Sequence, residues 1–260
     1  MAVLSHSSLS ALLAAILSFV LLFSSPVAMA ESNREVQTIA PPKHYGMLLF
    51  QAFETLDVFG PLDALQILSR NHTMNLSLIS SSNTLDPVTT RPRAPGMNPR
   101  NSSFSQSVLP THTIKDAPDL DVLIIPGGLG TRAPDLNAMI DYIRTTYPKL
   151  QYLITVCTGT GLVAQAGILN GRRATTNKSS WASTVALGPK VKWQGHARWT
   201  VDGNIWTSSG ISAGIDVTFA FIQHVYGDDE ATDIANLMEY ERHQDPKWDP
   251  FAGIFNVTPP

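Results

Sequence analysis

The sequence of 260 residues contains a single cysteine, Cys157, which excludes a disulfide bond within the chain. An odd cysteine in a secreted protein suggests either pairing with another chain or a reactive free thiol. The alternative is a buried cysteine that acts as a small hydrophobic residue, because free cysteine is among the most buried residue types. The composition alone leaves both interpretations open.

The sequence also lacks an excess of positive charge. It has 18 Lys and Arg residues against 21 Asp and Glu residues and shows no basic stripe, so we expect no nucleic-acid partner. After residue 30, no apolar run is long enough to span a membrane. The histidines lack the spacing of metal ligands, such as H-x-x-x-H. We therefore expect no metal site.

An apolar N-terminal segment is typical of a targeting signal. Ala11–Phe23 carry no charge, and this run is too short to cross a bilayer but suits the core of a signal peptide. Ala28 and Ala30 occupy the A-x-A positions, which predicts cleavage after Ala30. We predict a signal peptide over 1–30, a flexible leader over 31–43 and a secreted protein, free of the membrane after cleavage. Because the first ten residues lack Lys and Arg, an uncleaved anchor is the alternative.

Sequons of the type N-x-[ST] support passage through a secretory pathway, although each one alone is weak support. Glycosylation is expected at some of five asparagines: Asn71, Asn75, Asn101, Asn177 and Asn256.

Strands and helices alternate along the chain from residue 44 to 253, and residues 254–260 form a tail. Most predicted strands are continuously apolar, as in "YGMLLF" and "DVLII". Such runs are typical of a parallel sheet that is covered by helices on both faces. The sequence therefore predicts one α/β domain, a three-layer sandwich, over 44–253.

Local signals predict several details of these elements. Thr55 is expected to cap a helix that Gly60-Pro61 would kink or restart. A second helix should be capped near Asp135, and Asp202-Gly203 should form the turn of a hairpin. Residues 83–119, rich in Pro, Ser and Asn, are expected to form a long loop, with short strands at most.

Three glycine-containing corners compete for the functional site. The first, "GTGLVA", matches a dinucleotide-binding pattern, but no Asp or Glu occurs between Gln165 and Val201 to hold a ribose. The second, "GISAG", matches the elbow of a serine hydrolase with Ser212 as nucleophile. Only 46 residues follow Gly214, and they read as helices and a polar tail, so a small-residue turn is the better interpretation.

The third corner carries Cys157, between a predicted strand and a predicted helix. Backbone N–H groups and the helix dipole at such a corner favour a thiolate, which predicts a lowered pKa for the thiol. Gly159 and Gly161 allow a sharp turn. No histidine adjoins the cysteine, so Asp57 is the best candidate for the acid or base. The alternative role of Asp57 is to stabilise a helix N-terminus.

Four segments resemble, in order and spacing, the ThiJ/PfpI superfamily of the class I glutamine-amidotransferase-like fold, and most of all its branch of isonitrile hydratases. The segments are "FETLDVFGPLDAL", "DVLIIPGGLGTR", "ITVCTGTGLVAQAGILNGRRATT" and "WTSSGISAGIDVTFAFI". The resemblance implies a flavodoxin-like sandwich with the cysteine at a nucleophile elbow. It also implies a homodimer and a small-molecule substrate, with no cofactor.

The resemblance implies roles for five residues. Cys157 would be the nucleophile and Asp57 the acid and base. Thr158 would hydrogen-bond near the thiolate and offer its amide, and the amides of Gly127 and Gly128 would face the pocket. Together these residues would add water to an isonitrile, R–N≡C, and release an N-substituted formamide through a thioimidate on the cysteine.

The sequence departs from this pattern at one place, where members often read "ATTHW" and this chain reads "ATTNKSSW". Three alternatives stay open. The chain is a non-enzymatic sensor in which Cys157 responds to oxidants or ligands, or it is another thiol enzyme that acts on aldehydes or amides. The third alternative is the hydrolase based on Ser212.

Overall fold

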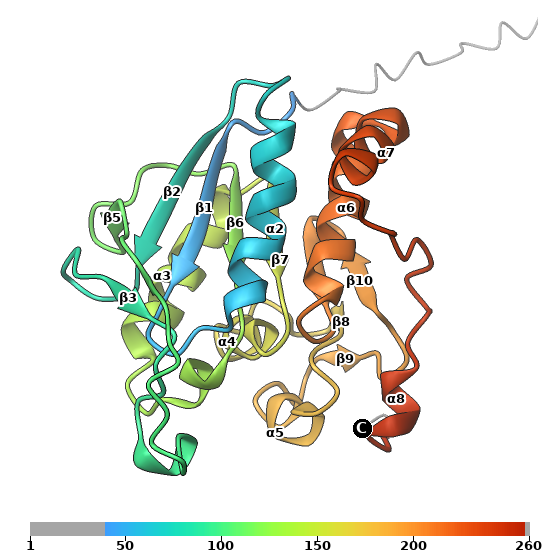
Figure 1. Ribbon diagram of the computed structural model, residues 1–260. Coiled ribbons are helices and arrows are strands. Elements are labelled where there is room, and N and C mark those ends of the chain that lie inside the picture. Colours follow the sequence, from blue (N-terminus) through green and yellow to red (C-terminus); the bar gives the residue numbers. More distant parts are fainter. Residues whose placement is uncertain (1–39, 258–260) are drawn as a thin grey trace, which may run out of the picture. The chain divides into compact units, whose positions relative to one another are not determined.

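A seven-stranded sheet forms the centre of the computed structural model, which describes residues 40–257 (Figure 1). The strands lie in the order β10-β11-β7-β6-β1-β2-β5. Their bounds are β1 His44–Leu49, β2 Asn75–Ser80, β5 His112–Thr113, β6 Val122–Ile125, β7 Tyr152–Thr155, β10 Trp199–Asp202 and β11 Ile205–Ser208. The predicted signal peptide and residues 31–39 of the predicted leader lie outside the described residues.

Neighbouring strands of this sheet run parallel except for β10 and β11, which form an antiparallel hairpin. Tyr45 of β1 pairs with Leu76 of β2 on one side and with Val122 of β6 on the other. The strand order therefore reverses at β1, and open α/β sheets bind ligands at such a switch point, beyond the carboxyl ends of the strands. Figure 1 shows that β1 ends at the same edge at which α2 begins.

Helices cover both faces of the sheet, which confirms the predicted three-layer α/β sandwich. One group of helices packs together on one face: α2 Thr55–Leu68, α6 Ala213–Tyr226 and α7 Asp228–Leu237. A second group packs on the other face: α3 Asn137–Thr146 and α4 Gly159–Gln165. The core between the layers is apolar, and Phe219 and Phe221 of α6 are its largest fully buried side chains.

Shorter elements lie in the connections. Residues 83–119 form a long loop with short elements, as predicted: β3 Val88–Thr89, η1 Pro95–Met97, β4 Ser107–Val108 and β5. The others are η2 Leu129–Arg132, η3 Tyr147–Lys149, β8 Arg173–Ala174, α5 Trp181–Val185, β9 Lys192–Trp193 and α8 Phe251–Ile254. β8 and β9 pair with each other in a separate two-stranded sheet. In the described residues 40–257, no helix has the length and apolar character needed to cross a membrane.

Two expectations about α2 are wrong. Thr55 is the first helical residue instead of the cap, and Glu54 precedes the helix without a capping side-chain hydrogen bond. The helix also continues without a break through Pro61. Proline has no N–H to donate to the carbonyl of Asp57, four residues earlier, so one helical hydrogen bond is missing. Burial of Pro61 and its neighbours in the core keeps the helix continuous.

The predictions for the start of α3 and for the turn of the hairpin also need correction. α3 begins at Asn137, preceded by Leu136, while the carboxylate of Asp135 binds the guanidinium of Arg93 through two hydrogen bonds of 2.7 Å. In the hairpin of β10 and β11, Asp202 pairs with Ile205, so the turn is Gly203-Asn204. Gly203 supplies the positive φ of 62° that the turn requires.

Candidate active site

Cys157 lies at a sharp corner between β7 and α4, as predicted. Its φ of 58° is positive, which is rare and costly for a residue other than glycine. The backbone N–H of Cys157 donates to the carbonyl of Ser209 at 3.1 Å, which ties the corner to the end of β11. The residue is only 4% exposed. The strained corner therefore directs the thiol into an enclosed site, in the manner of a nucleophile elbow.

Gly159 explains why the corner fits against the sheet. A Cβ atom on this glycine would lie 2.5 Å from the carbonyl oxygen of Ile125 and 2.6 Å from that of Pro126. The glycine therefore allows α4 to approach the end of β6. Residues 159–164, the "GTGLVA" pattern, are buried in α4. They therefore pack the elbow against the sheet and do not form a crevice for a dinucleotide.

Asp57 lies in the first turn of α2, near the carboxyl ends of the neighbouring strands β1 and β6. Its side chain is fully buried, and the Oδ2 atom accepts a hydrogen bond of 2.8 Å from the N–H of Gly127. The Oδ1 atom is buried without a hydrogen-bond partner. Burial raises the pKa of Asp57 to about 7, and the charge of Glu54 adds a smaller increase. The hydrogen bonds from Gly127 and from the Cys157 thiol act in the opposite direction but are outweighed.

The Cys157 thiol contradicts the expectation of a lowered pKa. Burial, and then the charge of Asp57, raise the pKa of the thiol to about 12. The backbone N–H groups of Ile211 and Thr158 and the side-chain amide of Asn177 act in the opposite direction. Because burial outweighs these donors, the resting site holds a neutral thiol next to a carboxyl group that titrates near neutral pH.

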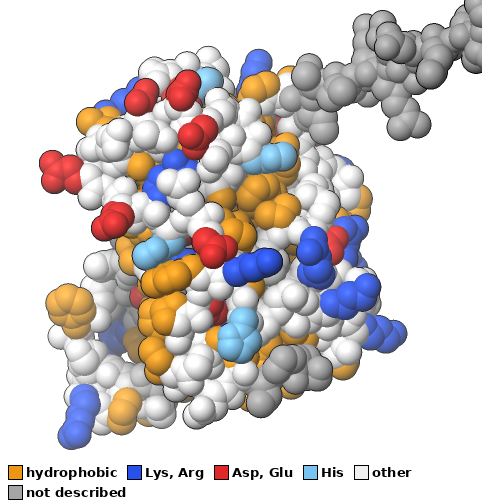
Figure 2. Space-filling view, turned by 90° about the vertical axis from the view of Figure 1, so that its right-hand side faces the viewer, with side chains coloured by type: hydrophobic (Ala, Val, Ile, Leu, Met, Phe, Trp, Pro, Cys, Tyr) orange, Lys and Arg blue, Asp and Glu red, His pale blue; other side chains and the backbone are white. Residues whose placement is uncertain are grey.

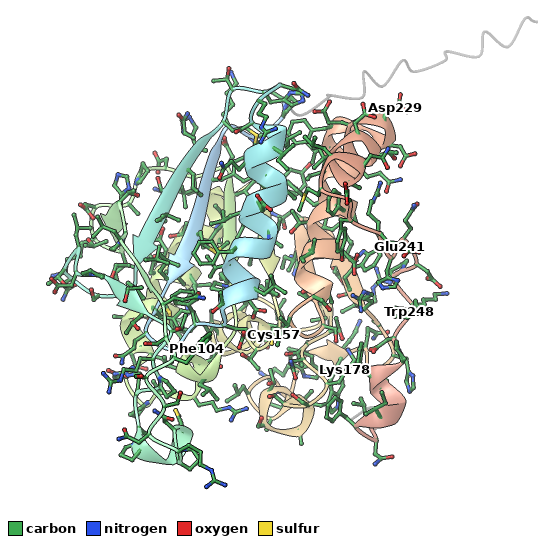
Figure 3. The ribbon with its side chains drawn as sticks, viewed as in Figure 1. Phe104, Cys157, Lys178, Asp229, Glu241 and Trp248 are labelled. Atoms are coloured by element: carbon green, nitrogen blue, oxygen red, sulfur yellow. The ribbon has the colours of Figure 1, made fainter. Side chains whose placement is uncertain are left out.

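Gly127 brings the carboxyl group and the elbow together. A Cβ atom at this position would lie 2.6 Å from the backbone nitrogen of Thr158 and 2.9 Å from Oδ2 of Asp57. No other residue fits between the two elements without moving one of them. Figure 3 shows Cys157 close to the first turn of α2, the turn that contains Asp57.

The amides of Gly127 and Gly128 do not face an open pocket, which corrects the expectation for both. The Gly127 N–H is bound to Asp57, and the Gly128 N–H donates to Oγ1 of Thr158 at 3.0 Å. The Thr158 hydroxyl also accepts a hydrogen bond of 3.1 Å from Thr131. The hydroxyl of Thr158 is therefore held away from the sulfur, and only its backbone N–H points to it.

Two residues that contact the sulfur were not predicted as site residues. The side-chain nitrogen Nδ2 of Asn177 lies 3.1 Å from Sγ of Cys157, and the N–H of Ile211 also points at the sulfur. Ile211 has a strained positive φ of 42°. The signals were present in the sequence: Asn177 stands in "ATTNKSSW", where the chain departs from its family pattern, and Ile211 stands in the "GISAG" corner.

Asn177 is oriented by its own loop. Its Oδ1 atom accepts hydrogen bonds from the Ser179 hydroxyl at 2.6 Å and the Ser180 N–H at 3.0 Å, which leaves Nδ2 directed at the sulfur. Gly210 leaves the necessary space, because a Cβ atom there would collide with Nδ2 of Asn177. The amide is therefore a fixed donor to the sulfur atom.

The prediction of a glycoprotein with a signal peptide is corrected, because no signal peptide is evident and glycosylation is unsupported. The Asn177 side chain, one of the five predicted glycosylation sites, is committed to the site, so Nδ2 has no room for a glycan. The apolar run behind the signal-peptide prediction lies outside the described residues. Exposure of the other sequon asparagines, Asn71, Asn75, Asn101 and Asn256, does not by itself indicate glycosylation.

Ser212 does not have the surroundings of a nucleophile. Its φ of −62° is ordinary, and the strained residue of that corner is Ile211. The hydrogen bond that the Ser212 hydroxyl makes is a long one of 3.5 Å from the guanidinium of Arg198, which cannot act as a base. Within residues 40–257, no three His, Cys, Asp or Glu side chains are grouped so that they could hold a metal ion.

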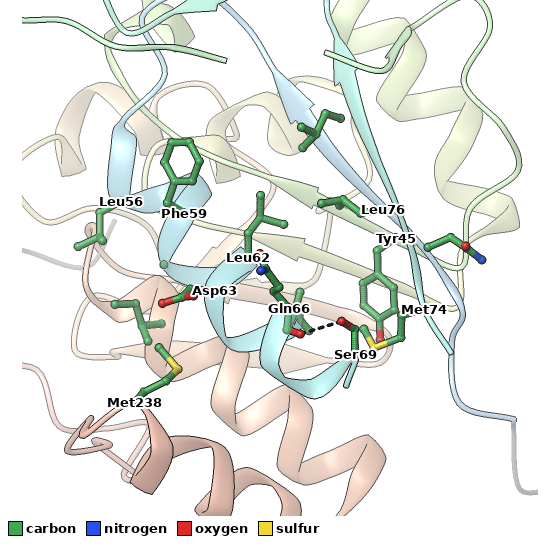
Figure 4. A pocket seen from close by; sticks show the side chains of 15 residues that line it. Tyr45, Leu56, Phe59, Leu62, Asp63, Gln66, Ser69, Met74, Leu76 and Met238 are labelled. Atoms are coloured by element: carbon green, nitrogen blue, oxygen red, sulfur yellow. Dashed lines mark hydrogen bonds between the residues drawn. The ribbon is translucent and has the colours of Figure 1, made fainter. Parts of the chain in front are cut away.

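Two cavities differ in their relation to the thiol. A cavity of about 270 Å³ adjoins the site, because Asn177 and Ile211 are among its lining residues. A larger groove of about 560 Å³ lies on the other side of α2, between this helix and β2, and is lined mainly by apolar side chains such as Leu56, Phe59 and Leu76 (Figure 4). The smaller cavity is the nearer of these two to the thiol, because Asn177 and Ile211 point donors at the sulfur, whereas the residues that line the groove do not.

Comparisons with known proteins agree with this geometry. The model of the DJ-1/PfpI family matches residues 44–224. An isonitrile hydratase from Pseudomonas putida is 34% identical over 196 residues, which are 75% of this chain and 77% of that enzyme. The HTH-type transcriptional regulator GbdR of Pseudomonas aeruginosa (strain UCBPP-PA14) is 26% identical over 141 residues, 54% of this chain and 38% of the regulator.

A crystal structure shows the same fold. It is that of a ThiJ/PfpI family protein from Pseudomonas syringae, with a TM-score of 0.64, 24% sequence identity and coverage of 84% of each chain. The family match spans more than half of the chain and contains Asp57, Gly127, Cys157 and Asn177. The chain belongs to the DJ-1/PfpI family.

Proposed function

We propose that this protein is a cysteine-dependent hydratase that converts isonitriles into N-substituted formamides. The observation that supports the proposal best is the buried pair of a neutral thiol and a carboxyl group whose pKa lies at about 7. Such a carboxyl group can both take and give a proton at neutral pH. The 34% identical isonitrile hydratase from Pseudomonas putida supports the same reaction.

The first step forms a covalent bond between the sulfur and the substrate. Ionised Asp57 takes the proton of the Cys157 thiol, and the resulting carboxylic acid gives that proton to the terminal carbon of R–N≡C. The thiolate attacks the same carbon, which yields the thioimidate R–N=CH–S–Cys157. The amides of Ile211, Thr158 and Asn177 stabilise the sulfur while it is negative.

The second step returns the free enzyme. Asp57 takes a proton from a water molecule, whose oxygen adds to the imidate carbon, and gives this proton to the nitrogen. The adduct R–NH–CH(OH)–S–Cys157 then collapses: Asp57 takes the hydroxyl proton, the C–S bond breaks and R–NH–CHO is released. Asp57 gives the hydroxyl proton to the leaving sulfur, which restores the neutral thiol and the carboxylate. The sum is R–N≡C plus water to give the formamide, and neither a metal nor an organic cofactor enters the balance.

Formamide production tests the proposal directly. Methyl, cyclohexyl and benzyl isonitrile are offered to the wild type and to the Cys157→Ala and Asp57→Asn variants, and the products are quantified by mass spectrometry. We expect turnover by the wild type and a loss of about a thousandfold or more in both variants. A wild type that is inert on all three substrates contradicts the proposal, as does full activity in either variant.

A second candidate function is ligand or oxidant sensing by the same thiol. It is favoured by the partial likeness to the regulator GbdR, although that protein is matched over only 38% of its length. Sensing predicts oxidation or ligation of Cys157 without turnover. Lack of formamide together with reversible sulfenate formation, or with oxidation to the sulfinate, at Cys157 would favour this function. Turnover of methylglyoxal would instead favour a thiol enzyme that acts on aldehydes.

A homodimer is a further part of the proposal, and it rests on the family resemblance. Sedimentation velocity of the full chain at several concentrations measures its mass in solution. A mass equal to one chain at all concentrations would contradict the homodimer without affecting the proposed chemistry.

A further inference from the structure

The C-terminal segment, residues 245–257, lies beyond the part of the chain that the family model matches, which ends at residue 224. It is nevertheless fixed to the protein by specific contacts. The N–H of Arg198 donates to the carbonyl of Pro246 at 2.8 Å, and the side chains of Ala252 and Val257 are buried. Figure 2 views the molecule from this side and shows acidic side chains at the upper end of the face, with hydrophobic side chains below them.

A buried ion pair fixes the segment next to the active site. Nζ of Lys178 lies 3.0 Å from Oδ2 of Asp249, and these two side chains are 1% and 2% exposed. Asp249 belongs to the C-terminal segment, whereas Lys178 directly follows Asn177, the donor to the Cys157 sulfur. Figure 3 shows Lys178 between the elbow and α8.

Lys178 also joins the two loops that form the wall of the elbow. Its ammonium group donates to Thr175 Oγ1 at 2.8 Å, to the carbonyl of Thr176 at 3.1 Å and to Ser209 Oγ at 3.2 Å. Ser209 in turn accepts the N–H of Cys157 through its carbonyl. Removal of one partner of such a buried pair leaves an uncompensated charge. The C-terminal segment is thus held in one place relative to the thiol.

The segment supplies the aromatic wall of the cavity that adjoins the site. Phe251 and Phe255 line this cavity of about 270 Å³ together with Asn177, Ile211 and five small or polar residues. The two phenylalanines are 40% and 48% exposed, although Phe251 begins α8 and Phe255 directly follows this helix, which is fixed by Ala252 and the ion pair. A cavity of this size is just below the range for drug-sized ligands, about 300 Å³ and above, and suits one ring-sized group.

From this arrangement we propose that the cavity receives the R group of the substrate and that Phe251 and Phe255 determine specificity for apolar, ring-bearing R groups. The reacting carbon would then lie at the sulfur, between the Asn177 and Ile211 amides, and the R group would extend over them to the aromatic side chains. The proposal names the substrate class of the proposed hydratase and rests on that function.

Substrate selectivity gives the first test. The ratio of kcat/KM for benzyl isonitrile to that for methyl isonitrile is measured for the wild type and for the Phe251→Ala, Phe255→Ala and Ile254→Ala variants. Ile254 is the matched control, because it lies on the same helix and is exposed but does not line the cavity. We expect the ratio to fall about fivefold to tenfold in each phenylalanine variant and to stay unchanged in the control.

A second test does not depend on the hydratase reaction. Because Cys157 is the only cysteine of the chain, alkylation of the intact protein by iodoacetamide reports on this thiol alone. The sulfur forms a bond to carbon, iodide leaves and the thiol proton goes to the solvent. The measured quantity is the alkylation rate with N-benzyl iodoacetamide divided by the rate with iodoacetamide. This ratio is then divided by the same ratio for free N-acetylcysteine. The resulting benzyl preference should be higher in the wild type than in either phenylalanine variant.

The two tests separate the failure of this inference from the failure of the proposed function. If isonitriles are converted but neither ratio changes in the phenylalanine variants, the cavity does not hold the R group and the inference is wrong. If no isonitrile is converted and the benzyl preference in alkylation is lost only in the phenylalanine variants, the cavity is the ligand site and the hydratase reaction is wrong. An equal effect of Ile254→Ala would also overturn the inference, since it would show a general change of α8.

Discussion

Asp57 and Asp216 are both buried in the interior, but their surroundings differ. Asp216 lies in α6 and is satisfied on both oxygens: Arg198 donates to Oδ2 at 2.6 Å, and the Tyr240 hydroxyl and the His243 N–H donate to Oδ1 at 2.8 and 3.0 Å. Among the described residues 40–257, Asp57 has no cation partner, and its Oδ1 atom accepts no hydrogen bond. The carboxylate of Asp216 therefore stabilises the fold, whereas the carboxyl group of Asp57 can hold a proton beside the thiol.

The contrast shows how one chain assigns two roles to the same side chain. A buried carboxylate is costly unless it is paired with a cation and fully hydrogen-bonded. The network around Asp216 meets that requirement and binds α6 to the segment that follows α7. The site around Asp57 does not meet this requirement, so the ionised form of the carboxyl group is unfavourable and its pKa is raised. Functional sites commonly contain such perturbed groups.

The largest expected effect comes from making the same substitution at both positions. Asp216→Asn leaves the buried guanidinium of Arg198 without its charge partner, and we expect a loss of about 3–5 kcal/mol in the free energy of unfolding. Asp57→Asn removes a buried charge at pH 8, and we expect a gain of about 1–3 kcal/mol. Urea denaturation of both variants at pH 8 measures the difference. Equal losses in the two variants would contradict the comparison.

The pH dependence of stability sharpens the same contrast. Asp57 is protonated in the folded protein up to about pH 7, whereas its ordinary pKa in an unfolded chain is 3.8. The folded state thus binds more protons than the unfolded state between these values, and stability must fall as the pH rises through this window. We expect a fall of about 1.4 kcal/mol per pH unit, about 4 kcal/mol in all, and no further change from this group above pH 7.

Comparison of the wild type with Asp57→Asn isolates this contribution, because all other titrating groups are shared. The difference between the two unfolding free energies should grow in favour of the variant from pH 4 to pH 7 and then stay level. A difference that does not vary with pH would show that Asp57 keeps an ordinary pKa in the folded protein.

Much of this site was readable in the sequence because its main features are local. Apolar runs that end in short turns predict the strand ends; Cys157 directly follows one such run, and Asp57 lies in the first turn of the helix after another. The parallel order of β1, β6 and β7 then brings these ends to one edge of the sheet. The resemblance to a known family supplied the pairing of the two residues, which local patterns alone left open.

Other features depend on contacts between distant parts of the chain. The thiol pKa was expected to be low from the helix dipole, a local effect, but burial by the whole fold raises it. Asn177 reaches the sulfur from the loop after β8, and Lys178 pairs with Asp249 in the C-terminal segment. No spacing or periodicity in the sequence indicates these pairs.

A smaller effect is expected from removing the Asn177 amide, which acts on the thiol and not on the fold. A hydrogen bond to a charged group contributes about 1.5 kcal/mol or more, so Asn177→Ala should raise the pKa of the thiol and slow alkylation by iodoacetamide about tenfold at pH 8. The alkylation rate as a function of pH measures this shift. Ser183→Ala is a suitable control, because Ser183 bonds only to the backbone of its own turn; an equal slowing in the control would assign the effect to the loop.

The smallest effect is expected at Ser212, which borders the network of Asp216. Arg198 lies between the two side chains and donates to the Ser212 hydroxyl at 3.5 Å and to Asp216 at 2.6 Å. The serine is exposed and has no base beside it, and its small side chain adds little to the wall of the cavity that it borders. Ser212→Ala should therefore change kcat/KM less than about twofold and stability by less than about 0.5 kcal/mol. The formamide assay and urea denaturation measure both values. A large loss of turnover in this variant, with Cys157→Ala still active, would move the chemistry from the Asp57 site to the network of Asp216 and reverse the roles assigned to the two aspartates.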